Sequence, residues 1–297
     1  MTPFRQPPTR IAFRIGAGLR WRVDALCDKL RDKQLIVELF VRRKLRLSQS
    51  ERRLIRDSQI YWNGPAERAL GQHSHWRNVG IFADDARWLA MGQDHMRLYR
   101  EFARVIDDKR PLERIVEWGC GGGMNAVHFG KEAREFYGVD ISPASLEECG
   151  RQMASAGLNN FRAVHIDAIH PELALQMIPN SCDLFISTYV FELLPTPEYG
   201  IRVLKIAFDL LRPGGIAIIQ VKYNGGDWRT ETRGWGYARN LAWNATYGIE
   251  EFWLAAEECG FIAKMVRLLP KQPLVNDRNY AYFLLLKGLA SSERQPD

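Results

Sequence analysis

The sequence predicts an α/β protein in which buried strands alternate with helices and form a mostly parallel sheet. Two observations lead to this prediction. The stretch from Ile115 to Asn125 reads as an apolar strand that ends in an acid and runs into closely spaced glycines. Beyond it, further apolar stretches of strand length alternate with helical stretches, which is typical of a parallel sheet with helices on both faces.

Three alternate glycines follow the first predicted strand, at Gly119, Gly121 and Gly123, with Glu117 two residues before them. A chain that leaves a buried strand turns sharply there, and the absence of a Cβ lets the backbone approach a nucleotide. Dinucleotide folds prefer G-x-G-x-x-G, which would need glycine in place of Met124. The loop therefore indicates a nucleotide cofactor, and the alternative is a turn that binds nothing.

Two later strands end in acids at the spacing that such a cofactor needs. Residues 136–140 read as a second strand ending in Asp140, followed by Ile141, and a carboxylate there can accept hydrogen bonds from both ribose hydroxyls. A third strand over 161–166 ends in Asp167 and Ala168, which are placed to contact adenine. The alternative for either acid is to cap the next helix or turn.

The remaining elements complete the alternation. A fourth strand over 183–187 runs into Thr188 and Tyr189, and a helical stretch stops at the Leu-Arg-Pro-Gly-Gly sequence of residues 211–215. Residues 216–221 then read as a fifth buried strand.

With these motifs in order, residues 115–287 resemble a class I S-adenosylmethionine-dependent methyltransferase. The resemblance implies a Rossmann-like sheet of seven strands, mostly parallel, with the last strand antiparallel and inserted between the fifth and the sixth. Residues 261–269 and 280–286 suit the last two strands, and 250–259 the helix before them. It also implies that S-adenosyl-L-methionine is the cofactor, bound by Glu117, Gly119, Gly121, Gly123, Asp140, Ile141, Asp167, Ala168, Thr188 and Tyr189.

The acceptor is expected to be a small molecule. The Asn/Asp-Pro-Pro-aromatic motif of amino-methylating nucleic-acid enzymes does not follow the fourth strand, so a nucleic-acid substrate is unlikely on this ground. Residues 190–195, Val-Phe-Glu-Leu-Leu-Pro, resemble a segment of ubiquinone-biosynthesis-type methyltransferases, with Leu193 where that pattern has histidine. The expected reaction is in-line transfer to oxygen, nitrogen or carbon of a metabolite, glycan or lipid intermediate. The sequence shows no metal-ligand constellation.

Candidates for catalysis are His75 as a base, and Glu192 and Asp227 as acids that orient a substrate. For each, a structural or surface role is the alternative. Residues 223–247, which include Trp228, Trp235, Tyr237 and Trp243, are expected to set substrate specificity, because so aromatic and long a connection is unusual.

We divide the chain into a basic helical extension (residues 1–60), a helical lid (61–110), the methyltransferase domain (111–290) and a polar tail (291–297). The extension carries 15 Lys and Arg residues against 6 Asp and Glu residues, with apolar residues at helical spacing. Such helices favour peripheral contact with an anionic membrane surface, and the alternative is packing with a solvated basic face. Two other functions stay open: an RNA methyltransferase tethered by this extension, and a regulatory protein that binds the cofactor without turnover.

Five scattered cysteines, without a C-x-x-C pair, favour a reducing compartment. With no apolar run long enough to span a bilayer, the sequence predicts a cytoplasmic protein. It does not predict an oligomeric state.

Overall fold

The computed structural model describes residues 33–42, 44–45, 47–64 and 75–289. The chain divides into two compact units, Met1–Ser48 and Gln49–Asp297. In the first unit, residues 33–42 are helical. Most of the basic extension and the polar tail lie outside the described residues, and the domain boundaries at 60 and 110 stay predictions. Within the described ranges, no helix is both long and apolar enough to cross a membrane.

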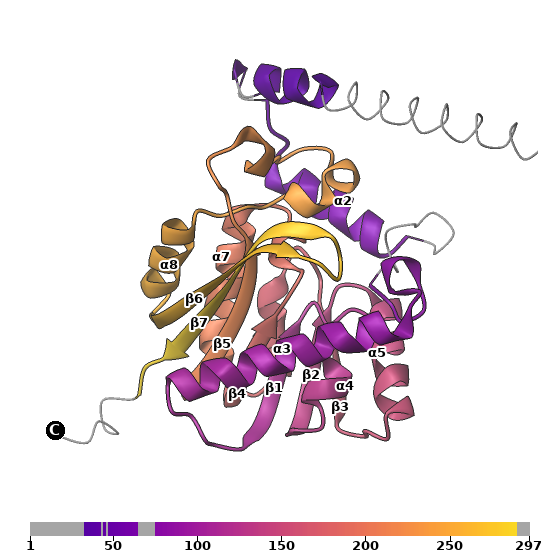
Figure 1. Ribbon diagram of the computed structural model, residues 1–297, viewed down its shortest axis with the longest axis vertical. Coiled ribbons are helices and arrows are strands. Elements are labelled where there is room, and N and C mark those ends of the chain that lie inside the picture. Colours follow the sequence, from indigo (N-terminus) through magenta and orange to yellow (C-terminus); the bar gives the residue numbers. More distant parts are fainter. Residues whose placement is uncertain (1–32, 43, 46, 65–74, 290–297) are drawn as a thin grey trace, which may run out of the picture. The chain divides into compact units, whose positions relative to one another are not determined.

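The second unit is built on a sheet of seven strands in the order β3-β2-β1-β4-β5-β7-β6 (Figure 1). Neighbouring strands β1 to β5 pair in parallel, whereas β7 pairs antiparallel with both β5 and β6. The predicted Rossmann-like sheet, with its antiparallel last strand inserted between the fifth and sixth, is therefore confirmed. The strands are β1 (Leu112–Trp118), β2 (Ala133–Asp140), β3 (Phe161–His165), β4 (Cys182–Ser187), β5 (Leu211–Lys222), β6 (Phe261–Gln272) and β7 (Asp277–Lys287).

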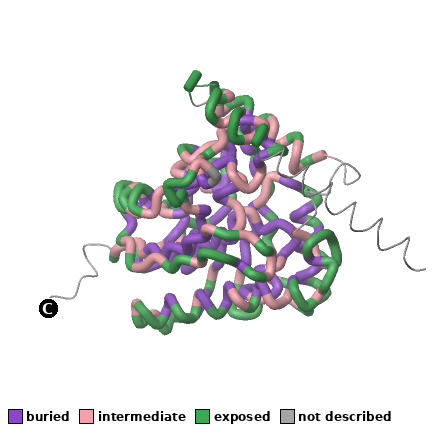
Figure 2. The backbone as a smooth tube through the Cα atoms, turned by 45° about the horizontal axis from the view of Figure 1, so that its top comes forward, coloured by how far each residue is buried: buried purple, intermediate pink, exposed green. Residues whose placement is uncertain are grey.

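Helices cover both faces of the sheet because successive strand residues point to opposite sides. In β5, Ile216 and Ile218 belong to the apolar cluster under one set of helices: α3 (Asp85–Val105), α4 (Ala126–Phe129) and α5 (Pro143–Ser155). Ala217 and Ile219 belong to the cluster under the other set: α6 (Ala174–Met177), α7 (Pro197–Leu210) and α8 (Ile249–Glu258). Figure 2 shows the resulting buried centre and exposed outer surfaces.

The turns at the carboxyl ends of the strands are set by local capping. Ser142 lies just after β2 and its hydroxyl accepts from the backbone N–H of Ser145, with Pro143 in the first turn of α5. Thr196 caps α7 in the same way, by accepting from Tyr199. Both caps satisfy N–H groups that a helix start leaves unpaired.

The β6–β7 hairpin is longer than the sequence predicts. The sixth strand was expected to end at Leu269, but β6 continues through Pro270 to Gln272, which pairs with Asp277. Proline is tolerated because β6 is the edge strand, where one N–H is not needed by a neighbour. The extension carries Asp277 and the preceding turn past the end of β5, whose pairing with β7 ends at Tyr280.

Helix α2 (Glu51–Trp62) and several single turns of 3₁₀ helix complete the second unit. The helix α2 buries Leu54 and Ile55, and Ile55 joins the same apolar cluster as α7. Single 3₁₀ turns fill the connections: η2 (Gly80–Phe82), η3 (Pro171–Leu173), η4 (Phe191–Leu193), η5 (Trp228–Thr230), η6 (Tyr237–Arg239) and η7 (Leu241–Trp243).

Candidate active site

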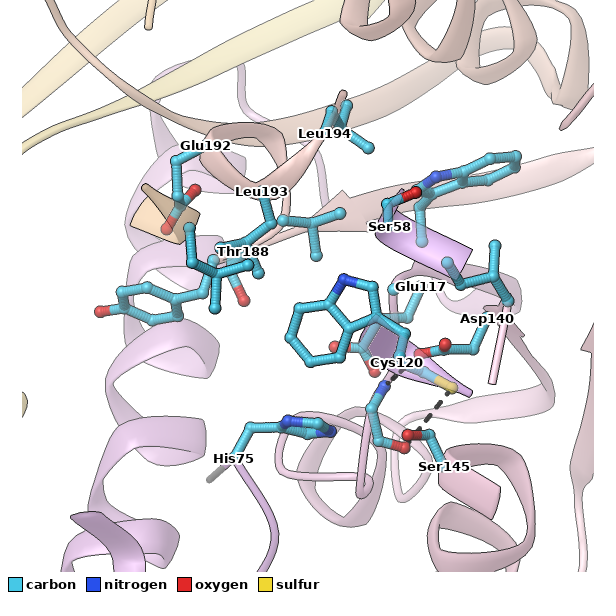
Figure 3. A pocket seen from close by; sticks show the side chains of 18 of the residues that line it. Ser58, His75, Glu117, Cys120, Asp140, Ser145, Thr188, Glu192, Leu193 and Leu194 are labelled. Carbon is cyan, nitrogen blue, oxygen red and sulfur yellow. Dashed lines mark hydrogen bonds between the residues drawn. The ribbon is translucent and has the colours of Figure 1, made fainter. Parts of the chain in front are cut away.

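A cavity of about 350 Å³ lies at the carboxyl ends of β1, β2 and β4. This is the edge at which open α/β sheets bind ligands. Its walls are mostly apolar, with carboxyl groups at separate positions: Glu117 and Asp140 beside the glycine loop, and Glu192 and Asp277 further away. Figure 3 shows the side chains of Glu117, Asp140, Thr188 and Glu192 around the cavity.

The glycine loop requires glycine for steric reasons. Gly119, Gly121 and Gly123 have φ angles of +72°, +49° and +88°, which side chains disfavour. A Cβ on Gly119 would lie 2.4 Å from Val190 Cγ2, and one on Gly121 would lie 2.5 Å from His75 Cδ2. Gly119 and Gly121 also line the cavity, so loop backbone forms part of its wall, as a nucleotide cofactor needs.

Glu117, at the end of β1, is buried and lines the cavity. Its Oε1 accepts from Asn125 Nδ2 at 2.7 Å, while its Oε2 has no hydrogen-bond partner. Burial raises the pKa of Glu117 to about 8, although the hydrogen bond from Asn125 acts in the opposite direction. A positively charged amine is the group that would complete this carboxylate, and the methionine part of the expected cofactor carries one.

Asp140 is half-buried at the end of β2 and accepts two backbone N–H groups, from Gly121 at 3.0 Å and from Ser142 at 2.9 Å. Burial raises the pKa of Asp140, and these hydrogen bonds partly offset it. Each carboxylate oxygen keeps a free acceptor site, so the pair of ribose hydroxyls fits here. Ile141 and Ala168 line the cavity beside it.

Asp167 lies elsewhere. It is exposed and is not among the residues that line the cavity. Its Oδ1 accepts from Gln59 Nε2 of α2 at 3.0 Å and from the backbone N–H of Ile169 at 2.7 Å. The structure thus shows Asp167 in the turn-capping role that was its alternative, while Ala168 reaches the cavity.

Asn125 organises the cofactor end of the cavity, and sequence reasoning did not single it out. Its Nδ2 also donates to Thr188 Oγ1 at 3.0 Å, and its Oδ1 lies 2.7 Å from Nδ1 of the buried His95. Burial lowers the pKa of His95 to about 4, so this imidazole is neutral and donates its Nδ1 proton to Asn125. The amide therefore connects β1, β4 and α3. An asparagine two residues after the last glycine of the loop was the available signal.

Tyr189 follows Thr188 in a left-handed conformation, with φ at +58°. Its backbone N–H donates to Gln220 Oε1 at 2.7 Å, and its ring packs edge-on against Tyr280, with centroids 5.1 Å apart. A non-glycine residue in this conformation costs free energy and often occurs at functional sites. Thr188 and Tyr189 both line the cavity, as predicted for the end of the fourth strand.

Glu192, in η4, is the buried carboxyl at the other end of the cavity. Its Oε2 has no hydrogen-bond partner. Burial raises the pKa of Glu192 to about 7; the charge of Lys222 partly opposes this, and Asp277 adds to it. At neutral pH this group can therefore either hold or release a proton.

Lys222 and Asp277 form an ion pair beside Glu192. The fully buried Lys222 Nζ lies 2.8 and 2.7 Å from the two Asp277 oxygens and 4.2 Å from the centroid of the Trp243 ring. Tyr280 donates to Asp277 Oδ2 at 2.5 Å. Burial alone would raise the pKa of Asp277, but the charge and hydrogen bonds of Lys222 and Tyr280 lower it below its usual range.

Neither Lys222 nor Asp277 was predicted as a site residue. The signal for Lys222 was a lysine that directly follows the apolar run predicted as the fifth strand. Asp227, which was predicted, is exposed on the loop after β5 and does not line the cavity. The acid that does so from that side is Asp277, on the hairpin.

The predicted lid and specificity segments both contribute walls. From the first come Trp62, His75, Ile81 and Phe82, and from the second Tyr237, Leu241 and Ala242. His75 packs against Trp62, with ring centroids 5.8 Å apart, and Trp62 Nε1 donates to Tyr237 Oη at 2.8 Å. Trp228 and Trp235 do not line the cavity. Among the residues that the structure describes, no three His, Cys, Asp or Glu side chains are grouped as a metal ion would require.

The sheet order, the glycine loop and the acid at the end of β2 define the class I fold of S-adenosylmethionine-dependent methyltransferases. Residues 115–215 also match the family model of a methyltransferase domain. This region, about a third of the chain, is therefore a methyltransferase domain of this class, and the resemblance drawn from the sequence is confirmed. S-adenosylmethionine is the cofactor of the class, and the orphan oxygen of Glu117, the loop backbone and Asp140 fit it.

The methyltransferases that resemble this chain in sequence have names that indicate different methyl acceptors. A tRNA (guanine-N(7)-)-methyltransferase from Vibrio vulnificus is 30% identical over 31% of this chain, and the match spans only 38% of that relative's length. A ubiquinone biosynthesis O-methyltransferase from Ralstonia nicotianae is 26% identical over 56% of this chain and 68% of its own length. A solved methyltransferase structure from Methanosarcina mazei superposes with a TM-score of 0.50 at 15% identity, over 63% of this chain and 98% of that one. A [4+2]-cyclase does so equally well, over 64% and 82%, so this likeness shows the fold alone.

Proposed function

We propose that this protein transfers a methyl group from S-adenosylmethionine to a small, largely apolar molecule bound at the Glu192 end of the cavity. One observation carries the proposal: a single cavity runs from Glu117 and the glycine loop to Glu192 and Asp277. A cofactor held by the first group of residues and an acceptor held by the second would share that space. The chemistry that the cofactor supplies is an activated methyl group on a sulfonium.

The protein's own contribution would be alignment and the exclusion of water. In-line displacement depends mainly on holding the nucleophile, the methyl carbon and the sulfur in register. The apolar walls formed by Phe82, Leu193 and Leu241 suit a dry reaction space. The Tyr189 and Tyr280 rings provide faces that stabilise a cation by about 0.5 to 2 kcal/mol.

The test has two stages. Calorimetric titration of S-adenosylmethionine and S-adenosylhomocysteine should show binding to the wild type that weakens strongly in Asp140→Ala. Asp209→Ala, an exposed aspartate on α7, is the matched control and should bind normally. Mass spectrometry of a panel of phenols, alcohols, amines and quinol-like lipids, incubated with the cofactor, then identifies the acceptor. Absence of cofactor binding in the folded wild type would refute the proposal, and binding without methylation of any compound would favour the non-catalytic alternative.

Methylation of tRNA is a second candidate, favoured by the 30% identity with the Vibrio vulnificus enzyme and by the basic extension. Its test is methyl transfer to total tRNA at low and at moderate salt. Basic residues that bind phosphates lose affinity steeply as salt rises. Efficient transfer to tRNA, with that salt dependence, would replace the small-molecule proposal.

A further inference from the structure

At the end of the cavity away from the glycine loop, η4 supplies Glu192 to the wall and the start of β7 supplies Asp277 and Tyr280. Lys222 of β5 does not line the cavity but pairs with Asp277. The register brings Lys222 opposite Tyr280 in the β5–β7 pair. Asp277 has its charge matched by Lys222, and its second hydrogen-bond donor is Tyr280. Glu192 has an unpartnered oxygen, although it is only 2% exposed.

An unpartnered, buried carboxylate oxygen costs free energy in the free protein, so its retention in a ligand cavity calls for a ligand group. Because Oε2 of an ionised carboxylate only accepts, the missing partner is a hydrogen-bond donor. We infer that Glu192 is the proton acceptor for a hydroxyl nucleophile, so that the acceptor molecule is an alcohol or a phenol and the reaction is O-methylation. This inference rests on the proposed function.

The step balances in protons and electrons. The acceptor O–H bond breaks and its proton goes to Glu192 Oε2. A lone pair on the oxygen of the acceptor molecule forms the new bond to the methyl carbon. The C–S bond of the donor breaks, and its electron pair stays on sulfur. The carboxylate and the sulfonium begin as opposite charges, and both are neutral afterwards. An enclosed, mostly apolar cavity favours such a loss of charge.

The charges nearby favour a hydroxyl over an amine. An aliphatic amine enters mainly as an ammonium ion at neutral pH and must lose a proton before it can attack. It would also add a cation next to Lys222, whose Nζ is already buried beside Glu192, and next to the sulfonium. A neutral hydroxyl avoids both costs.

The titratable groups that interact electrostatically with Glu192 come from several elements. They are Lys222 of β5, Asp277 and the phenols of Tyr280 and Tyr282 of β7, and the phenols of Tyr189 and Tyr247. Burial raises the pKa of all four phenols, so they stay neutral near pH 7. The sulfonium of S-adenosylmethionine would then be the main charge added near Glu192, and it should lower the pKa of this carboxyl. Because that pKa is about 7, the loss of its proton can be measured at neutral pH.

Proton release on cofactor binding tests this without any acceptor. Titrations of S-adenosylmethionine and S-adenosylhomocysteine, in two buffers of different ionisation enthalpy near pH 7, report the protons released. The wild type should release more with the sulfonium than with the neutral thioether, by up to about half a proton for a group with a pKa near 7. Subtracting the two titrations removes contributions common to both ligands.

Two variants make the test specific. Glu192→Gln should bind both ligands but lose the difference, whereas Glu198→Gln, the same change at an exposed site in the first turn of α7, should keep it. An undiminished difference in Glu192→Gln would overturn the role of Glu192. Failure of the wild type to bind either ligand would instead overturn the proposed function.

A matched pair of acceptors tests the substrate class. 4-Ethylbenzyl alcohol and 4-ethylbenzylamine, at equal millimolar concentration with S-adenosylmethionine, differ only in the nucleophile, and the amine is mainly an ammonium ion at neutral pH. We expect the wild type and Glu198→Gln to methylate the alcohol, and Glu192→Gln to do so at a rate at least about 100-fold lower. Methylation of the amine in preference to the alcohol would overturn the hydroxyl assignment.

Discussion

Replacing Glu192 with glutamine is expected to make the free protein more stable at alkaline pH. Burial raises the pKa of this carboxyl from 4.5 to about 7. The folded state then holds the proton more tightly than the unfolded state. The free energy of unfolding is therefore highest below the unfolded pKa, and it falls as pH rises toward the folded pKa. Glutamine has no such titration.

The magnitude follows from the shift. The full penalty at high pH is about 3 kcal/mol, at about 1.4 kcal/mol for each unit of pKa. Part of this penalty is already present at about pH 5.5. Between that pH and about pH 8, the free energy of unfolding of the wild type should therefore fall by about 2 kcal/mol more than that of Glu192→Gln. Titrations of Glu117 and His95 occur in both proteins and cancel from this comparison.

Urea unfolding at the two pH values gives the result directly. The comparison is made within each protein, so that a constant packing effect of the glutamine does not contribute. Glu198→Gln is the control and should follow the wild type. If Glu192→Gln shows the same pH dependence as the wild type, Glu192 is not held as a buried, unpartnered carboxyl, and the assignment of a base at this position fails.

Three further predictions concern other parts of the site. Asn125→Ala removes hydrogen bonds to Glu117, Thr188 and His95. It should lower the free energy of unfolding in urea by about 3 kcal/mol and weaken S-adenosylhomocysteine binding, measured by calorimetry, about tenfold or more. Unchanged binding would contradict the positioning role of Asn125. Gly121→Ala places a Cβ 2.5 Å from His75 Cδ2 and should weaken S-adenosylhomocysteine binding, measured by calorimetry, at least about tenfold. The control is Gly157→Ala, at a glycine with a φ of +76° and open space around it. This control should lose about 1 kcal/mol of stability and keep normal binding. Lys222→Met leaves Asp277 without its cation and should lower the free energy of unfolding by about 3 kcal/mol. The double variant Lys222→Met/Asp277→Asn should recover part of that loss. No recovery would mean that the two side chains are not coupled.

The cofactor end of the cavity was predictable because its residues are local. Glu117 and the three glycines lie within one strand-to-helix turn, and Asp140 follows one helix and one strand later. In a parallel sheet this spacing brings the two strand ends together, whatever the rest of the chain does. The order of strands, including the antiparallel insertion, came with the resemblance and agrees with the structure.

The sequence pattern did not locate acids whose side chains have alternative hydrogen-bond partners in the folded protein. Asp167 lies two residues after β3, but Gln59 of α2 and the backbone of Ile169 bind its carboxylate, and it does not line the cavity. The helix α2 is distant in sequence, and no motif announces its position. Asp227 and Asp277 are alike in sequence terms, since each is an acid in a connection near a strand end.

By itself, then, the sequence determined the fold and the loop and acid expected to hold the nucleotide part of the cofactor, because these depend on backbone turns and fixed spacings along the chain. Only the tertiary structure decided which charges meet at the far end of the cavity. Lys222 and Asp277 are 55 residues apart and meet because β7 pairs antiparallel with β5, which brings the hairpin over the end of the sheet. The state of Glu192 is likewise a property of burial among distant elements, because the same glutamate on an open loop would be an ordinary acid.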